Sequence, residues 1–534
     1  MRSSTFNSLT AWAHRSMISL EEHEQKRAAL INADRALRID HPKSPHIRPL
    51  EDRGDKLVRR IRAEEAVEVW GVEHDAILHP YPGMEFLVGK DIIIKTQLFK
   101  ILRNMPKGAL LHVHLELTVD AHFLIRLALP HTSIHIRSPE VITSANMSSV
   151  VPEIKPLDPD FEAEASSLTD PDYIPGSWIP LHRARELFDQ GLGSSQGFDI
   201  WITSHMVITA NAAYVTHNNH RIWDKFHSSA HLRMGLVYYI PIWEQYIRLF
   251  LEDIIADGVM YAEARINFSP KFMIGPDGKE NVPHIEWLRA FKRVVDDVKS
   301  EKDDFFDAKI IYTVIRNCDT EELRAHLQDC LAMKKAFPDL IVGFDLVGHE
   351  PTLKPLREYI EPLLQFKELQ KQESVCIPYI FHAGETCGDG TPDDENLYDA
   401  ILLETKRIGH GFSLVKHPKL MQMCREQRIA LEVCPISNEV LRLTGSMIMH
   451  PLPILLNNGV PVALSSDDPA LFQNKGLSYD FFQVLVASEV NGLLTLSHLA
   501  RDSITYSMLG DAEKGSLMQR WEDRWVKFLG ELVA

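Results

Sequence analysis

An alternation of two kinds of segment constrains this chain more than any other feature. From residue 259 onward, short apolar and β-branched runs alternate with amphipathic stretches such as residues 287–301 and 320–336. Runs that are almost continuously apolar are typical of parallel strands buried on both faces. Residues 108–116 supply a first such run, and the other seven are residues 259–268, 308–317, 340–350, 377–385, 407–414, 429–438 and 460–469.

Eight βα units predict a (β/α)8 TIM barrel, which we expect to span residues 101–534. A doubly wound open sheet is the alternative. The barrel is favoured because polar residues cluster at the C-terminal end of nearly every expected strand. Barrel enzymes keep their catalytic groups at that end.

Two regions depart from the alternation. Within residues 1–100, stretches with helical periodicity between about 17 and 80 are interrupted by Pro42, Pro45 and Pro49. We expect an N-terminal helical segment that packs against the main domain or mediates homodimerisation. Residues from about 131 to 183 are rich in Ser, Pro and Asp. Because a structureless loop of that length is unusual in a compact domain, we expect an inserted, partly mobile lobe after the first strand.

Helical patterns return in residues 184–256, where three large aromatic residues stand out. We expect Trp223, Phe226 and Trp243 to anchor the apolar core, because such residues at helical spacing usually face a core. None of the three is expected to belong to a binding site.

Four of the expected strands end in residues that can bind a metal ion. Side chains two apart on a strand point to the same face, so His112 and His114 can lie side by side. The other three ends are His382-Ala383-Gly384-Glu385, Gly409-His410-Gly411 and Ser465-Ser466-Asp467-Asp468-Pro469. In a barrel these ends converge on one mouth. Imidazole and carboxylate groups without cysteine are typical of a catalytic zinc site with one open position.

Such a site would support hydrolysis. Zinc lowers the pKa of bound water from about 15.7 to about 7 and makes hydroxide available at neutral pH. His410 and Asp467 suit the task of holding and aiming that water, and Glu385 suits the task of proton donor. Each fragment alone has a structural explanation, since Asp-Asp-Pro is common in turns and His-Ala-Gly-Glu in strand-to-helix junctions. The prediction therefore depends on all four occurring in order, each at a strand end.

The charge balance narrows the classes of partner. The formal net charge is −17, which disfavours a surface for nucleic acid or an anionic membrane, and no apolar run is long enough to span a bilayer.

The six cysteines show no Cys-x-x-Cys spacing, which favours reduced thiols. His14 and Arg15 interrupt the only apolar-leaning stretch near the N-terminus, so no signal peptide is predicted. We expect a cytoplasmic protein, with secretion as the alternative.

Taken together, these motifs resemble those of the adenosine deaminase family. The matching stretches are LLHVHLE, VMYAEARINF, GFDLVGHE, IFHAGET, RIGHGFSL, LEVCPISN and SSDDP. MPKGALLHVH and RIGHGFSLVKHP are most similar to the branch called adenosine deaminase-related growth factors. The resemblance covers most of residues 101–510. It implies zinc-dependent hydrolytic deamination of adenosine and 2′-deoxyadenosine to inosine and 2′-deoxyinosine with release of ammonia. It also implies one zinc ion per chain and a homodimer.

The resemblance also implies roles for single residues. The residues that match zinc ligands are His112, His114, His382 and Asp467. Glu385 matches the glutamate that protonates N1 of the purine, and His410 matches the histidine beside the attacking water.

Three further matches concern the substrate. Asp468 matches an aspartate that contacts N7, and Gly348 matches a glycine whose N–H contacts N3. Glu116 stands where adenosine deaminases carry an aspartate that contacts the ribose 5′-hydroxyl, and it is one methylene longer. The expected lobe contains no cysteine, whereas secreted members of the branch carry a disulfide there.

Other functions remain open at this point. A related amidohydrolase could act on a free base, a nucleotide or an N6-substituted adenosine. The carboxylate of Glu116 disfavours a nucleotide, because it would repel a 5′-phosphate. A growth-factor-like binding protein without activity would be expected to have lost a zinc ligand, and none is lost.

Overall fold

The computed structural model describes residues 18–41, 48–74, 77–163, 165, 167–214 and 219–534. Residues 1–17, which hold most of the stretch searched for a signal peptide, lie outside this part of the chain, as do Pro42 and Pro45. All eight expected strands are present: β1 Gly108–His114, β5 Val259–Asn267, β8 Asp307–Ile315, β9 Ile341–Val347, β10 Ile380–Ala383, β11 Arg407–His410, β12 Ala430–Val433 and β13 Val462–Leu464.

These strands form two four-stranded parallel sheets. One has the order β1-β5-β8-β9 and the other the order β10-β11-β12-β13. Isolated parallel bridges pair Phe344 with Tyr379 and Val113 with Asp467, so both edges of the first sheet approach the second. The protein therefore has an α/β fold with parallel sheets, and its strand ends point to a shared face.

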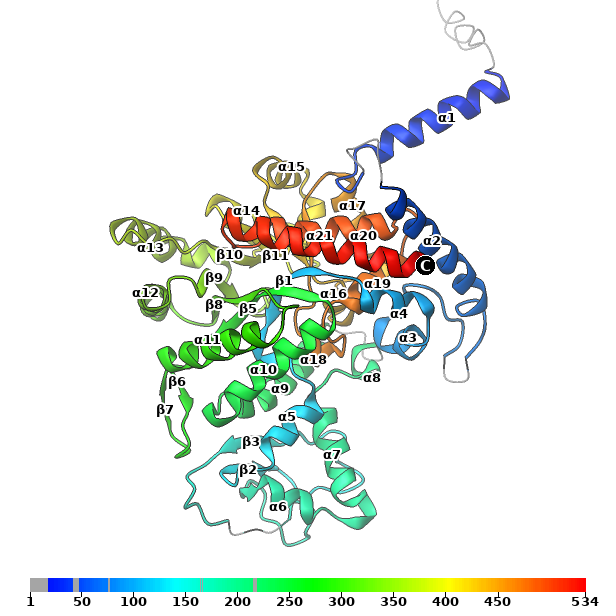
Figure 1. The fold of residues 1–534 in the computed structure, drawn as a ribbon. Helices are drawn as coiled ribbons and strands as arrows, with labels where there is room; N and C mark the ends of the chain where they lie inside the picture. Colours follow the sequence, from blue (N-terminus) through cyan, green and yellow to red (C-terminus); the bar gives the residue numbers. More distant parts are fainter. Residues whose placement is uncertain (1–17, 42–47, 75–76, 164, 166, 215–218) are drawn as a thin grey trace, which may run out of the picture.

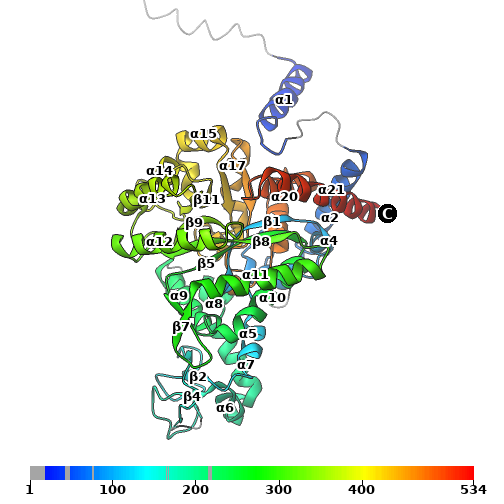
Figure 2. The ribbon, with the colours of Figure 1, turned by 60° about the vertical axis from the view of Figure 1, so that its left-hand side comes forward.

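Helices between consecutive strands lie outside the sheets (Figures 1 and 2). The apolar residues of α11 recur three and four apart, and Trp287, Phe291 and Val295 are buried on its inner face. A capping box at Asp319 begins α12. The α-helices between residue 284 and the C-terminal helix are α11 His284–Glu301, α12 Thr320–Ala336, α13 Ile360–Gln372, α14 Asn396–Leu402, α15 Pro418–Gln427, α16 Pro435–Val440, α17 Leu452–Asn457, α18 Pro469–Phe472, α19 Ser478–Val486 and α20 Leu493–Thr505, of which the last three follow β13.

The N-terminal residues form four helices: α1 Leu20–Arg35, α2 Pro49–Glu68, α3 Phe86–Ile93 and α4 Gln97–Asn104. Pro49 occupies the first position of α2, where a missing N–H costs nothing. This helix lies beside α20 and the C-terminal α21, Asp511–Val533, and Trp525 Nε1 donates to Glu51 Oε1 at 2.9 Å. By contrast, α1 has no buried residue and projects from the body (Figure 1). A role for this segment in dimerisation stays a prediction.

The residues of the expected inserted lobe contain a small antiparallel sheet of order β3-β2-β4. Its strands are β2 Ile134–Arg137, β3 Glu153–Pro156 and β4 Ile179–Pro180. Ile136, Ile154, Leu168 and Tyr173 of this segment are buried, whereas Phe161 and Ile174 are exposed. Helices α6, Leu181–Glu186, and α7, Ser194–His205, complete the lobe seen at the bottom of Figures 1 and 2.

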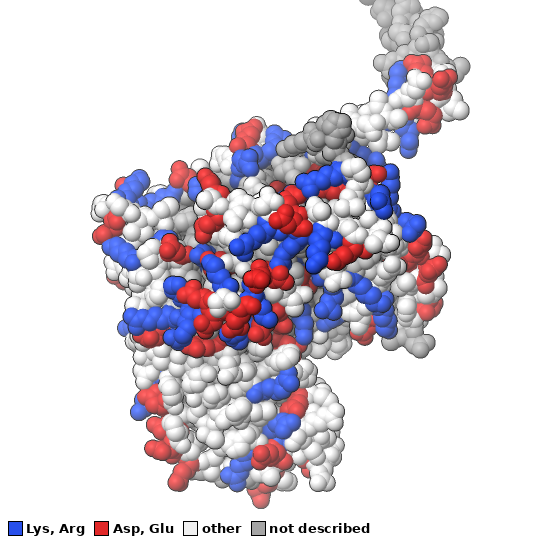
Figure 3. All heavy atoms as spheres, in the orientation of Figure 1, with Lys and Arg blue, Asp and Glu red and all other residues white. Residues whose placement is uncertain are grey.

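Four more helical elements and a hairpin complete the fold: α5 Ala121–Ala128, α8 Ala210–Tyr214, α9 Asn219–Val237, α10 Ile240–Ala256, and the strands β6 Phe272–Ile274 and β7 Glu280–Pro283. On the face seen in Figure 3, acidic and basic side chains are interspersed rather than gathered by sign. All six cysteines are free, and only Cys376 and Cys387 are exposed. Among the described residues, no helix combines the length and the apolar character that crossing a bilayer requires.

Candidate active site

The four residues expected to bind a metal lie together at the strand ends. Their ligand atoms, from His112, His114, His382 and Asp467, are all within 4.8 Å of one another. Asp467 Oδ1 lies 3.3 Å from His112 Nε2 and 3.4 Å from His114 Nε2. Strand β1 supplies two of these residues, β10 supplies His382, and Asp467 follows β13.

Backbone pairing explains how Asp467 reaches the histidines. Asp467 N donates to His112 O at 3.1 Å, and His114 N donates to Asp467 O at 3.0 Å. Asp467 has a φ of 62° and His410 a φ of 59°, in the left-handed region that non-glycine residues rarely adopt. Strained residues of this kind are held by their surroundings and cluster at functional sites.

Two buried carboxylates orient the histidines from behind. His112 Nδ1 lies 2.7 Å from Glu432 Oε2, and His382 Nδ1 lies 2.7 Å from Asp345 Oδ2. Because an ionised carboxylate can only accept, each Nδ1 carries the proton and each Nε2 is free to bind a metal. This carboxylate–imidazole arrangement is usual behind metal-binding histidines.

Arginines inside the fold join these carboxylates into one network. Arg265 donates to Asp345 at 2.8 Å and to Glu432 at 2.7 Å. Arg407 donates to Glu432 and to Glu263, both at 2.6 Å. The sequence analysis missed this network. Its signal was a charged residue inside each of several otherwise apolar strands, since a buried charge requires a partner.

The site fits a metal ion in its chemistry as well as its geometry. His112 Nε2 is buried and makes no hydrogen bond, which is costly unless a ligand uses it. Burial lowers the pKa of His114 to about 3, and burial followed by the neighbouring charge of His112 lowers that of His382 well below its ordinary value. Both imidazoles are therefore neutral at pH 7, the state that binds zinc.

Two expected catalytic groups border this cluster. Glu385 Oε1 lies 3.7 Å from His410 Nε2, which in turn lies 3.9 Å from Asp467 Oδ2. Burial, and after it the charges of Asp467 and Glu350, raises the pKa of Glu385 well above its ordinary value. This shift favours the neutral acid form of Glu385, which is the form that a proton donor needs. Burial lowers the pKa of His410 to about 3, so this imidazole can accept a proton or a hydrogen bond.

Side chains of α16 contact both Asp467 and His410. Ser437 Oγ donates to Asp467 Oδ2 at 2.7 Å, and Asn438 Nδ2 lies 3.3 Å from His410 Nδ1. These contacts leave Asp467 Oδ1 directed at the histidines and His410 Nε2 directed at the cavity side of the site.

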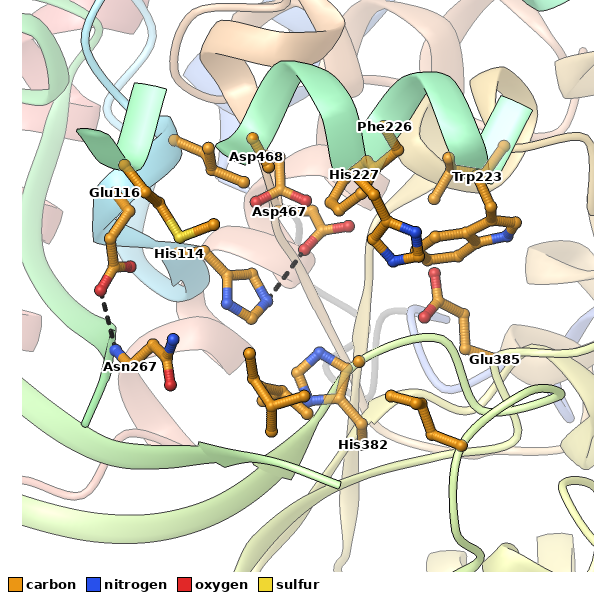
Figure 4. A pocket seen from close by; sticks show the side chains of 18 of the residues that line it. His114, Glu116, Trp223, Phe226, His227, Asn267, His382, Glu385, Asp467 and Asp468 are labelled. Atoms are coloured by element: carbon orange, nitrogen blue, oxygen red, sulfur yellow. Dashed lines mark hydrogen bonds and ion pairs between the residues drawn. The ribbon is translucent and has the colours of Figure 1, made fainter. Parts of the chain in front are cut away.

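The cluster opens into a cavity of about 320 Å³, a size typical of small-molecule sites. Figure 4 shows Glu116 at one side, Glu385 and Trp223 at the other, and His114 between them. The cavity is lined by His114, Glu116, Leu117, Trp223, Phe226, His227, Ala230, Met234, Asn267, Ile315, Asn317, Val347, Gly348, Leu353, His382, Glu385, His410, Leu441, Asp467 and Asp468.

Two aromatic residues in this lining correct the sequence analysis. Trp223 and Phe226 belong to α9 and face the cavity, so the prediction that they lie outside the site is wrong. Trp223 stacks on His349 with ring centroids 4.1 Å apart. The helix presents one apolar face to an open cavity, and periodicity alone does not distinguish a cavity from a core. Trp243 is fully buried in the core, as predicted.

The three expected substrate contacts all line the cavity. Glu116 Oε1 accepts from Asn267 N at 2.8 Å and from Tyr238 OH at 3.0 Å. Burial raises the pKa of Glu116, and these hydrogen bonds oppose the rise.

The other two expected contacts are Gly348 and Asp468. Gly348 has a φ of 112°, and a Cβ there would come within 2.5 Å of Leu353 Cδ1, so this position favours glycine. Asp468 Oδ1 is buried and has no hydrogen-bond partner among the described residues, which leaves it free for a ligand.

Comparison with known proteins agrees with this geometry. Residues 223–524 match the family model described as adenosine deaminase. The chain is 33% identical over 456 residues to adenosine deaminase 2 of Homo sapiens, which covers 85% of this chain and 84% of that protein. The chain belongs to the adenosine deaminase family.

Its relatives place it in the adenosine deaminase 2 branch, the adenosine deaminase-related growth factors, which confirms the resemblance found in the sequence. It is also 34% identical over 442 residues to adenosine deaminase of Lutzomyia longipalpis, covering 82% of this chain and 80% of that protein. The solved structure of adenine deaminase from Arthrobacter aurescens matches 79% of this chain and 99% of its own at a TM-score of 0.52 and 21% identity. That likeness concerns the fold.

Proposed function

We propose that this family member is a zinc-dependent adenosine deaminase. It converts adenosine and 2′-deoxyadenosine to inosine and 2′-deoxyinosine and releases ammonia. The observation that carries the proposal is the convergence of four ligand atoms within 4.8 Å beside Glu385 and His410. A non-catalytic binding protein would have no use for this buried, preorganised set.

Zinc is the metal that this donor set suits best, since three imidazoles and one carboxylate leave room for a water molecule. His112, His114, His382 and Asp467 would hold the ion, which when bound would supply hydroxide at neutral pH by lowering the pKa of water. His410 would orient the attacking water through Nε2, which faces Asp467 Oδ2 at 3.9 Å.

Glu385 would deliver the proton that the purine needs. Attack of water at C6 forms a C–O bond and makes N1 basic, and Glu385 in its acid form protonates N1. The C6–N6 bond then breaks as the C6=O bond forms. Of the two protons of the attacking water, one leaves with the amino group as ammonia and the other restores the acid form of Glu385. The raised pKa of Glu385 supports this role because it favours the acid form.

Gly348, Asp468 and Glu116 would bind the substrate. The backbone N–H of Gly348 and the carboxyl of Asp468 would contact N3 and N7 of the purine. Glu116, at the far side of the cavity, would accept a hydrogen bond from the ribose (Figure 4). No lysine or arginine is among the described residues that line the cavity, which disfavours a 5′-phosphate.

The proposal extends to the whole molecule. The two sheets would form one closed (β/α)8 barrel, supported by the bridges Phe344–Tyr379 and Val113–Asp467. The N-terminal segment, residues 1–100, would mediate a homodimer, and residues 131–183 would be a lobe inserted in a catalytic domain of residues 101–534. We also retain the cytoplasm as the proposed compartment.

A substrate panel on metal-analysed protein tests this function. Adenosine and 2′-deoxyadenosine should release ammonia, with adenine, AMP and an N6-methylated adenosine as slower competitors. Activity should fall on chelation and return with zinc, at about one ion per chain. Active protein without a transition metal, or a preference for another aminopurine, would contradict the proposal.

A further inference from the structure

The side chain of Glu385 has no anchor of its own. Its Oε1 atom is buried without a hydrogen-bond partner among the described residues, and His410 Nε2 lies 3.7 Å away. The preceding residue, Gly384, has a φ of 75°, so the chain turns sharply just before Glu385. The direction of this side chain therefore depends on how the main chain is held at these two residues.

Glu350 holds the main chain at that point. Its Oε1 accepts from Glu385 N at 2.9 Å, and its Oε2 accepts from Gly384 N at 3.3 Å. Glu350 is only 2% exposed and lies two residues after Gly348, on the loop that follows β9. One carboxylate thus bonds to two successive N–H groups and connects the loop after β9 to the loop after β10.

Glu350 is itself held from two sides. Asn396 Nδ2 donates to Glu350 Oε2 at 2.5 Å, and the same amide accepts from Leu356 N at 2.7 Å, which fixes its orientation. Arg316 Nη1 lies 3.3 Å from Glu350 Oε2. Arg316 also donates to the carbonyl oxygens of Leu346 on β9 and His382 on β10, so it joins the ends of these two strands.

We propose that Glu350 is a positioning residue, which holds the main chain of Gly384 and Glu385 so that the Glu385 carboxyl meets N1 of the purine. This inference rests on the proposed deamination. Its basis is the pair of hydrogen bonds to Gly384 N and Glu385 N, with every group of the clamp buried. A displacement of about 1 Å in a catalytic group can cost about 100-fold in rate, so a clamp of this kind matters for kcat.

Glu350→Gln tests the role. The substituted amide keeps one acceptor oxygen. Its NH₂ group must then face either Glu385 N or the group of donors at the other position, Gly384 N, Asn396 Nδ2 and Arg316 Nη1, so at least one hydrogen bond is lost in either orientation. We expect kcat for adenosine to fall on the order of 100-fold. KM should stay within about threefold and zinc content should match the wild type, because neither ribose contacts nor metal ligands change.

Glu65→Gln is the matched control. Glu65 is also a buried glutamate whose carboxylate accepts from two successive N–H groups, Gln97 N at 2.5 Å and Leu98 N at 3.2 Å. It lies on α2 and does not line the cavity. Glu65→Gln should therefore keep the wild-type kcat, even where both variants lose stability.

Asn396→Ala provides a second variant should Glu350→Gln not fold. It removes one donor to Glu350 and leaves the carboxylate in place, so kcat should fall about tenfold at nearly constant KM. A folded, zinc-loaded variant of either kind with wild-type kcat would overturn the positioning role, as would losses confined to KM or zinc content. If the wild type releases no ammonia from any aminopurine, the proposed function fails and the positioning role falls with it.

Discussion

Removing Arg265 should weaken both the fold and the metal site. The guanidinium is fully buried and donates to Asp345 at 2.8 Å, to Glu432 at 2.7 Å and to Leu111 O at 3.1 Å. Arg265→Met keeps an unbranched but shorter side chain and removes the charge and all three hydrogen bonds. Two carboxylates that orient His112 and His382 then lose their shared cation.

The remaining contacts set the size of the effect. Breaking a buried ion pair by removing one partner costs about 3–5 kcal/mol. After Arg265→Met, Glu432 still accepts from Arg407 at 2.6 Å, and Asp345 still accepts from His382 N at 2.9 Å. We therefore expect the free energy of unfolding to fall by about 3 kcal/mol, the lower end of that range. Zinc affinity should fall about 10–100-fold, as is usual when the partners of metal-binding histidines are disturbed.

The pH dependence has a definite sign. Although burial alone would raise the pKa of Glu432, Arg265 and Arg407 hold it well below its ordinary value of 4.5. Glu432 therefore stabilises the folded state above that pH, and the contribution is lost as the pH falls through the folded pKa. With Arg265 gone, acid unfolding should occur at a higher pH than in the wild type.

Urea unfolding and zinc competition against a chelator measure the two effects. Arg248→Met is the control, because Arg248 pairs with Glu301 at 2.8 Å on the surface, with the two side chains 34% and 49% exposed. Exposed pairs contribute only about 0–1 kcal/mol. If Arg265→Met costs no more than this control, and zinc affinity is unchanged, the interior network does not support the site.

Four further predictions follow from the site and the N-terminal segment. Glu385→Gln should lower kcat by about 10²–10⁴-fold while zinc content and unfolding free energy hold, because Gln mimics the neutral acid; wild-type turnover would exclude Glu385 as the proton donor. Glu116→Gln should weaken adenosine turnover and narrow its advantage over AMP, read as the ratio of the two kcat/KM values; an unchanged ratio would exclude the ribose role. Gly348→Ala should reduce kcat/KM for adenosine about tenfold, because alanine is strained at a φ of 112° and its Cβ would contact Leu353. Wild-type kinetics in this variant would show that the turn tolerates alanine. Full-length protein should be a dimer by light scattering at micromolar concentration. Deletion of residues 1–35, which removes α1, a helix with no buried side chain, should weaken dimerisation. A full-length monomer would refute the dimer.

The strands and the metal ligands could be predicted because their signals are local in sequence. A strand buried on both faces needs a nearly continuous apolar run, and β5 and β8 each show one. Reactive groups follow the carboxyl ends of such strands, so His382 and Asp467 stand out next to apolar residues. The convergence of ends from distant parts of the chain then follows from parallel pairing alone.

The interior network could not be predicted in the same way, because its pairs are far apart in sequence. Arg265 is 80 residues from Asp345 and 167 residues from Glu432. Buried charges stand in β5, which has two, and in β9, β11 and β12, but nothing local indicates which charge meets which. The prediction for Trp223 was wrong for a different reason, since a helix that faces a cavity and a helix that faces a core share one periodicity.

The same network explains why the metal site is set before any metal binds. Glu432 and Asp345 accept from Nδ1 of His112 and His382, which fixes both tautomers, and Arg265 fixes the two carboxylates relative to each other. The fold therefore keeps His112 Nε2 buried without a hydrogen bond, at a cost to its own stability. A ligand that binds only the folded state recovers that cost. Zinc binding should accordingly raise the unfolding free energy, and should raise it less once Arg265 is removed.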